Sequence, residues 1–189
     1  MFKTDDIGRT AKLKNAKLSY YTGQFEWAQA QLNVLKAATS DFIANDALYL
    51  AMLIGDNSFM DTTYEALGIF ARGDLLVYQN KLDSALIAFD SIEKFHPGHS
   101  LQDDILFKRA EIAAKRNDHV GAGEYYHKVW KEYGDELLAD DALYRLAQLQ
   151  EQKLDDNAKA MQYYQDLLLN FPGSLYTVEA RKRYRALRG

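Results

Sequence analysis

Small and large apolar residues recur at fixed distances along this 189-residue chain. Ala28, Ala85, Ala122 and Ala160 are each followed four residues later by a large apolar or aromatic residue, and three positions further on by an aliphatic one. A second small residue lies 12 or 13 positions before each alanine. Spacings of three and four residues bring side chains to one face of an α-helix, so the pattern predicts pairs of amphipathic helices.

The helix pairs themselves repeat, since the last two intervals between alanines are 37 and 38 residues. A period of this length is typical of solenoids, in which each helix pair buries its apolar face against its neighbours. Two helices approach closely only where neither carries a bulky side chain, which explains the small residues. The large residue one turn later fills the space beside that contact.

The units of the repeat resemble the tetratricopeptide repeat family. The two clearest units read Gly73, Ala85, Phe89, Ile92, Pro97 and Ala147, Ala160, Tyr164, Leu167, Pro172. The resemblance covers nearly the whole chain, although the usual tryptophan of the first helix is absent and the periods exceed the family's roughly 34 residues. It implies an all-α, right-handed superhelical solenoid of helix pairs, about ten helices in all. It also implies a noncatalytic scaffold for protein–protein interaction.

We predict one repeat domain over residues 1–189. Its units are residues 6–40, 61–99, 100–137 and 138–173, followed by a capping helix over residues 174–189. The period fails between Ala28 and Ala85, which are 57 residues apart, about one repeat plus twenty. We therefore expect an irregular extra helix over residues 41–60, after a break at Ser40–Asp41.

The binding surface is predicted from equivalent positions on the first helix of each pair, which in this family lines the concave face. These positions hold Leu13, Phe70, Phe107 and Tyr144, and beside them are Tyr20, Tyr78, Glu111, Lys115, Gln148 and Glu151. Apolar and aromatic groups with polar neighbours suit a peptide or a partner helix. The alternative is that some of these side chains simply pack between repeats.

No motif predicts catalysis, a cofactor or a metal site, and we expect that the protein is not an enzyme. The chain has no cysteine, and His96 and His99 alone do not supply the three or four ligands that a metal needs. The glycines of Gly121-Ala122-Gly123 lie within the helical pattern, where they favour close packing over phosphate binding.

The net charge of −4 argues against nucleic acid as a partner, because phosphate contacts require a basic surface. No apolar run approaches 18 residues, so no transmembrane segment is predicted. The expected partner is a protein or peptide, and membership of a larger complex is left open.

The opening of the helix at residues 139–144 resembles tetratricopeptide proteins of the Gram-negative envelope. That resemblance implies a periplasmic or envelope-associated location within a longer precursor, with a cytoplasmic location as the alternative. It also leaves open a recruiting or regulatory module of a larger envelope or secretion assembly, or of a multidomain enzyme. We expect further repeats before residue 1, and hence an exposed apolar face at Ile7, Ala11 and Leu18.

Overall fold

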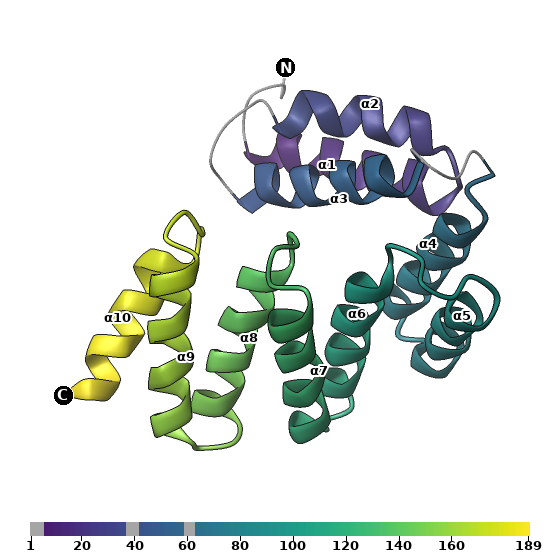
Figure 1. The fold of residues 1–189 in the computed structure, drawn as a ribbon. Helices are drawn as coiled ribbons and strands as arrows, with labels where there is room; N and C mark the ends of the chain where they lie inside the picture. Colours follow the sequence, from purple (N-terminus) through teal and green to yellow (C-terminus); the bar gives the residue numbers. More distant parts are fainter. Residues whose placement is uncertain (1–5, 37–41, 59–62) are drawn as a thin grey trace. The chain divides into compact units, whose positions relative to one another are not determined.

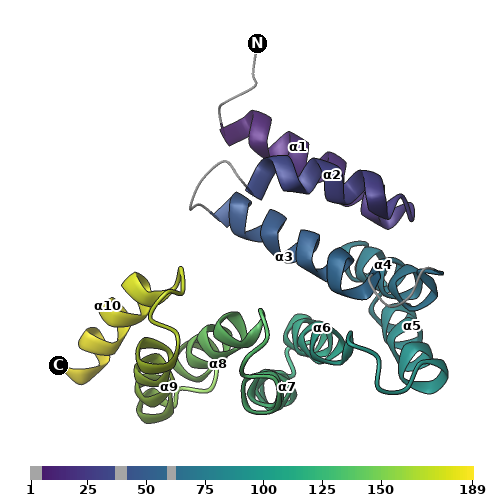
Figure 2. The ribbon, with the colours of Figure 1, turned by 45° about the horizontal axis from the view of Figure 1, so that its top comes forward.

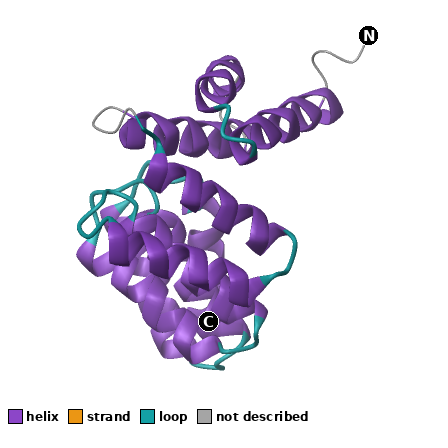
Figure 3. Cartoon of the chain, turned by 90° about the vertical axis from the view of Figure 1, so that its right-hand side faces the viewer, coloured by secondary structure: helices purple, strands orange, loops and turns teal. Residues whose placement is uncertain are grey.

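The computed structural model describes residues 6–36, 42–58 and 63–189, and these residues form ten α-helices and no β-strand (Figures 1 and 3). The helices are α1 Asp6–Tyr21, α2 Phe25–Lys36, α3 Phe42–Ser58, α4 Glu65–Tyr78, α5 Leu82–Phe95, α6 Gln102–Lys115, α7 His119–Glu132, α8 Ala139–Gln152, α9 Asn157–Asn170 and α10 Thr177–Arg188. The predicted all-helical fold is confirmed. The predicted break at Ser40–Asp41 lies outside the described residues.

The helices form two compact units, Met1–Leu101 and Gln102–Gly189. In the first unit α2 packs against both α1 and α3, α4 packs against α5, and α1 also contacts α4. In the second unit each of the helices α6 to α9 packs against the next one along the chain (Figures 1 and 2). Packing between consecutive helices is the arrangement expected of a solenoid.

The recurring small residues lie at the crossings of the paired helices. Ala28, Ala85, Ala122 and Ala160 have no exposed surface. At Gly73 of α4 an added Cβ would lie 2.5 Å from Cε1 of Phe89 on α5, closer than van der Waals contact allows. The Phe89 ring therefore rests directly on the backbone of α4, and only glycine fits at position 73.

Aromatic rings extend these crossings in three helix pairs. A ring on the first helix packs against the ring that follows the alanine on the second: Phe70 on Phe89, Phe107 on Tyr126 and Tyr144 on Tyr164, with centroids 5.4, 5.3 and 6.1 Å apart. Tilted and edge-on ring pairs at this distance add to the free energy gained by burying their apolar surface. In each of these three helix pairs, one small residue at the crossing and one contact between aromatic rings stabilise the packing of the two helices.

The turns within the helix pairs share one backbone feature. A residue with positive φ lies five positions before each recurring alanine: Gly23 (76°), Asn80 (58°), Asn117 (61°) and Asp155 (54°). Glycine, asparagine and aspartate adopt this left-handed conformation at the lowest cost. The turn that reverses the chain is therefore encoded at the same place in all four pairs.

The extra helix α3 interrupts the series of pairs. Its side chains Ala47, Leu50, Ala51 and Ile54 are buried, and the helix packs on α2. Near its end, Asn57 donates to the carbonyl of Leu53 over 2.7 Å and accepts a 2.6 Å hydrogen bond from the Ser100 hydroxyl. This contact ties α3 to the segment that follows α5.

Two glycines of α4 provide a matched test of the close crossing. Gly73→Ala places a methyl group against the buried Phe89 ring, and overpacking of this kind costs about 1–3 kcal/mol. Gly68 has no atom within 4 Å of an added Cβ, so Gly68→Ala should stabilise the protein by about 0.5–1 kcal/mol through helix propensity. Urea denaturation measures both changes. Equal stability of the two variants would contradict the close contact.

Candidate functional site

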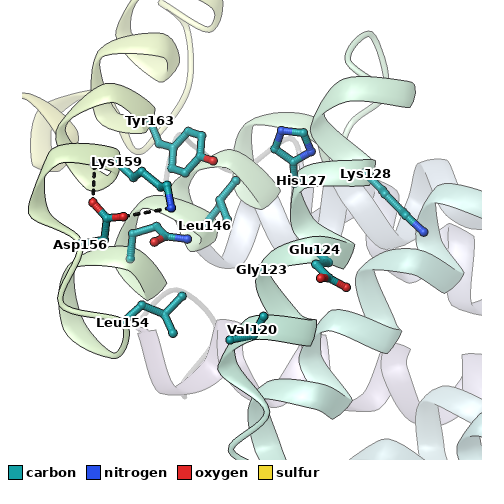
Figure 4. Close-up of a pocket in the computed structure, with 11 residues that line it drawn as sticks. Val120, Gly123, Glu124, His127, Lys128, Leu146, Leu154, Asp156, Lys159 and Tyr163 are labelled. Atoms are coloured by element: carbon teal, nitrogen blue, oxygen red, sulfur yellow. Dashed lines mark hydrogen bonds and ion pairs between the residues drawn. The ribbon is translucent and has the colours of Figure 1, made fainter.

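The second unit contains a groove between α7 and α9, with α8 as its floor (Figure 4). Its volume is about 570 Å³. The lining residues are Val120, Gly123, Glu124, His127 and Lys128 from α7, Leu146 and Gln150 from α8, Leu154 and Asp156 from the following turn, and Lys159 and Tyr163 from α9. Pockets of about 300–1,000 Å³ that combine apolar walls with a few polar groups are typical binding sites.

Gly123 sets how closely α7 lies on the floor of the groove. An added Cβ at this position would lie 3.4 Å from Cδ2 of Leu149 and 3.6 Å from Cδ1 of Leu146, both on α8. The neighbouring Gly121 is explained by a helix cap. The Asp118 carboxylate accepts from the Gly121 amide over 2.9 Å, and a Cβ on Gly121 would meet this carboxylate at 2.3 Å. Both glycines therefore act in packing and capping.

One wall of the groove carries a fixed pair of charges. The Asp156 carboxylate accepts from the backbone amide of Lys159 and forms an ion pair with its Nζ atom, both over 3.0 Å (dashed in Figure 4). The backbone hydrogen bond, followed by the side-chain one, lowers the pKa of Asp156, while the bond to Asp156 raises the pKa of Lys159. Both groups are consequently charged over the whole neutral range.

Three aromatic rings meet edge to face beside the groove, and two of them, His127 and Tyr163, line it. Trp130 lies edge-on to His127 and to Tyr163, with ring centroids 5.7 and 5.8 Å apart. The Nζ atom of Lys131 lies 3.5 Å from the Trp130 ring centroid, within the range of a cation–π contact. Burial raises the pKa of the Tyr163 hydroxyl, which is therefore neutral and able to donate at physiological pH.

A second group of polar side chains gathers on α8 and α10. The Glu151 carboxylate accepts from the Tyr164 hydroxyl over 2.8 Å and from Nε of Arg183 over 3.1 Å, and it forms an ion pair with the same guanidinium. Gln148 donates to the Tyr144 hydroxyl over 3.1 Å. The Tyr144 ring stacks on Tyr176, with centroids 4.3 Å apart and planes 12° apart. The polar groups of these side chains therefore form hydrogen bonds with one another.

The segment that forms most of α8 and all of α9 also matches a known family. Residues 141–174 match the family model described as Tetratricopeptide repeat, and they include the close helix crossing and one wall of the groove. This segment of the chain is thus similar to a tetratricopeptide repeat. No curated protein matches the chain.

Tetratricopeptide repeats are generally modules for protein–protein interaction, and their all-helical fold is typically noncatalytic. None of the helices in the described residues is both long and apolar enough to cross a membrane. Within the same residues, no three His, Cys, Asp or Glu side chains are grouped so that they could hold a metal ion. His96 and His99 lie edge to face, 6.3 Å apart.

The residues predicted to bind a partner divide into three groups by exposure. Four are buried: Leu13, Tyr20, Phe70 and Phe107. Glu111, Tyr144, Gln148 and Glu151 are partly exposed, and Tyr78 and Lys115 are exposed. The buried rings Phe70 and Phe107 pack on the second helix of their own pairs, and so within a repeat rather than between repeats. Partner binding by the accessible residues stays a prediction.

The structure brings only part of this predicted row together in space. Tyr144, Gln148 and Glu151 lie along one face of α8 in the second compact unit, and Glu111 on α6 accepts from Lys108 over 3.1 Å. The groove was missed because its walls come mainly from the second helices of the pairs. A usable signal was the second small residue, Gly123, beside the fully buried Ala122, since Gly123 lets α7 lie against Leu146 and Leu149 of α8.

Three tyrosines of the second unit generate a prediction for alkaline pH. Burial, the largest cause in each case, raises the pKa of Tyr126, Tyr164 and Tyr176, and the hydrogen bond to Glu151 adds to the effect at Tyr164. The unfolded chain ionises its tyrosines near pH 10. The stabilisation is therefore complete below about pH 10 and is lost as the pH rises further, because the unfolded state releases protons first.

Urea denaturation between pH 8 and 11.5, with tyrosinate absorbance as a second readout, measures this loss. Tyr164→Phe should reduce the steepness of the decline above pH 10, whereas Tyr78→Phe, at an exposed ring, should leave it unchanged. A decline that is the same in both variants would contradict the role of Tyr164.

Proposed function

We propose that this chain is a noncatalytic scaffold that binds a short segment of a partner protein in the groove of α7, α8 and α9. The observation that carries the proposal is the groove itself, which has an apolar floor, an aromatic end and charged walls. Similarity to a family of protein-interaction modules favours a peptide over a small metabolite as the occupant.

The charges of the groove indicate the chemistry of that peptide. Glu124 and Asp156 are balanced by Lys128 and Lys159, so the walls have no net charge. A strongly acidic or basic peptide gains little from such walls. The affinity must then come from apolar side chains set against Val120, Leu146 and Leu154, with polar contacts at the rim fixing the register.

The aromatic end supplies an anchor point. Tyrosine and tryptophan are enriched among the residues that dominate binding energy, because they offer a large contact area at a low cost in side-chain entropy. The Trp130 ring contacts His127, Tyr163 and the Nζ atom of Lys131, and these contacts order the rings before a peptide binds. A receptor surface that is already ordered loses little conformational entropy when the peptide arrives.

The face of α8 with Tyr144, Gln148 and Glu151 supports the proposal less well. Its carboxylate, amide and hydroxyl groups are already joined in hydrogen bonds. A ligand on this face would have to replace those bonds, and the net gain from exchanging one hydrogen bond for another is small.

Site-specific photocrosslinking tests the position of the groove. A photoreactive phenylalanine derivative replaces Val120, which is 62% exposed on the groove wall, or Val178, which is 76% exposed on α10 and does not line the groove. In native cells we expect a protein adduct from position 120 and none from position 178. Mass spectrometry of the adduct identifies the partner segment.

A synthetic peptide of the crosslinked segment then gives the affinity. Val120→Asp should weaken binding at least tenfold, while Val178→Asp should leave it unchanged, and both should retain the helical circular dichroism because their side chains are exposed. Equal adducts at both positions, or equal affinity of the two variants, would overturn the groove as the binding site.

A further inference from the structure

One polar side chain lies in the otherwise apolar floor of the groove. Gln150 of α8 lines the groove beside Leu146 and is only 9% exposed. Its backbone is fixed near the end of the helix, because its carbonyl accepts from the Asp156 amide over 2.9 Å. Within the described residues, the side-chain carboxamide of Gln150 forms no hydrogen bond. Such a group needs an explanation, since most buried polar side chains are hydrogen-bonded.

The equivalent residue of the first helix pair is polar as well, and it is bonded within the chain. Three positions after the small residue of the helix crossing, α8 has Gln150 and α1 has Ser19. The buried Ser19 hydroxyl donates to the carbonyl of Asn15 over 3.2 Å and accepts from Gln31 over 3.0 Å. The repeat can therefore supply partners to a polar group at this position, and at Gln150 it does not.

Gly123 leaves the carboxamide of Gln150 open to the groove. An added Cβ at position 123 would lie 4.0 Å from Nε2 of Gln150, so the carboxamide lies next to the α7 backbone with no side chain between them. On the other wall, Asp156 and Lys159 bond to each other (Figure 4). The donor and the acceptor of the carboxamide are thus available to a ligand.

A carboxamide carries one acceptor oxygen and two donor hydrogens in a single plane. The N–H and C=O groups of one residue in an extended peptide point to the same side and complement this arrangement. In an α-helix the same groups bond to each other within the helix, except at its ends. A ligand that covers the floor must replace the contacts of the carboxamide with water, which favours a segment with unbonded backbone groups over a helix.

The length of the groove also suits an extended segment. Val120 and Leu154 lie toward one end of the groove, and His127 and Tyr163 lie toward the other (Figure 4). From Val120 to His127 the axis of α7 advances about 10 Å, at roughly 1.5 Å per residue. An extended chain covers this distance in about three or four residues. Apolar side chains of such a segment can contact both ends while the residue between them lies over the floor.

We infer that the groove binds its peptide in an extended conformation and that Gln150 selects this conformation. Its carboxamide pairs with the N–H and C=O groups of one residue of the peptide, and the apolar side chains on either side of that residue contact the ends of the groove. This inference rests on the proposed function and adds to it the conformation of the partner segment and the residue that recognises its backbone.

The stability of the chain without peptide gives the first readout. Gln150→Met keeps a similar side-chain volume and removes an unpaired amide from a buried site, so the urea midpoint should equal or exceed that of the unchanged chain. Gln152→Met, at an exposed position of the same helix, is the matched control and should leave the midpoint unchanged. A lower midpoint for Gln150→Met would give the carboxamide a structural role and overturn the inference.

Peptides from a phage-displayed library of random twelve-residue sequences serve as the binding probe. Selection on the 189-residue chain, followed by removal of peptides that also bind Val120→Asp, retains those that occupy the groove. Gln150→Met should weaken their binding at least tenfold in fluorescence anisotropy, while Gln152→Met should leave it unchanged. Peptides shortened to six residues should keep their affinity within threefold, because an extended segment does not need the length that a helix requires.

Backbone N-methylation then locates the paired residue of the peptide. At one internal position it should weaken binding to the unchanged chain at least tenfold and binding to Gln150→Met less than twofold, because the effects of two bonded partners are not additive. Loss of binding on shortening to six residues would assign the groove to a helix. Coupling of Gln150 to a side-chain amide of the peptide would replace backbone recognition. Either result would overturn the inference.

The inference and the proposed function fail in different ways. Peptides that depend on Val120 and ignore Gln150→Met would overturn the role of Gln150 and leave the groove as the binding site. A library that yields no peptide dependent on Val120 would overturn the groove itself, and this inference with it.

Discussion

The close crossing of two helices at small residues is the contact on which the rest of this structure depends. It is clearest where the Phe89 ring rests on the backbone of Gly73, and the fully buried alanines at the other crossings show the same demand for space. Close approach brings more atoms into van der Waals contact and removes the rings from water. Each helix pair thereby becomes a stiff block that can pack against the next.

That crossing also decides which side chains are left for recognition. Phe70 and Phe107, which the sequence suggested as partner-binding residues, instead pack against rings on the second helix of their own pairs. What remains outside is the space between successive second helices, where Gly123 lets α7 lie close to α8 and where Tyr163, in edge-on contact with Trp130, lines the groove. Recognition by such a surface follows from stable packing, since the rings at its rim are already in place.

Equivalent apolar faces of two helices, α8 and α1, differ in whether another helix covers them. Helix α7 packs on α8, where Ala142 and Leu149 are buried, whereas Ile7, Ala11 and Leu18 of α1 are exposed. A repeat protein buries each apolar face only against its neighbour, and α1 is the first helix of the described residues. The exposure that the sequence predicted for this face is therefore observed.

The sequence by itself determined the helices, their pairing and their turns, because these depend on local periodicity and on residues such as Ala28, Ala122 and Asn117 whose size or backbone conformation has one main use. The irregular interval between Ala28 and Ala85 contains the segment in which α3 lies. Only the tertiary structure decided that Phe107 is buried and that a groove lies beside Tyr163. A side chain on an amphipathic helix points toward whichever neighbour lies there, and that neighbour comes from residues distant in the sequence, so burial and concavity emerge only when the helices pack.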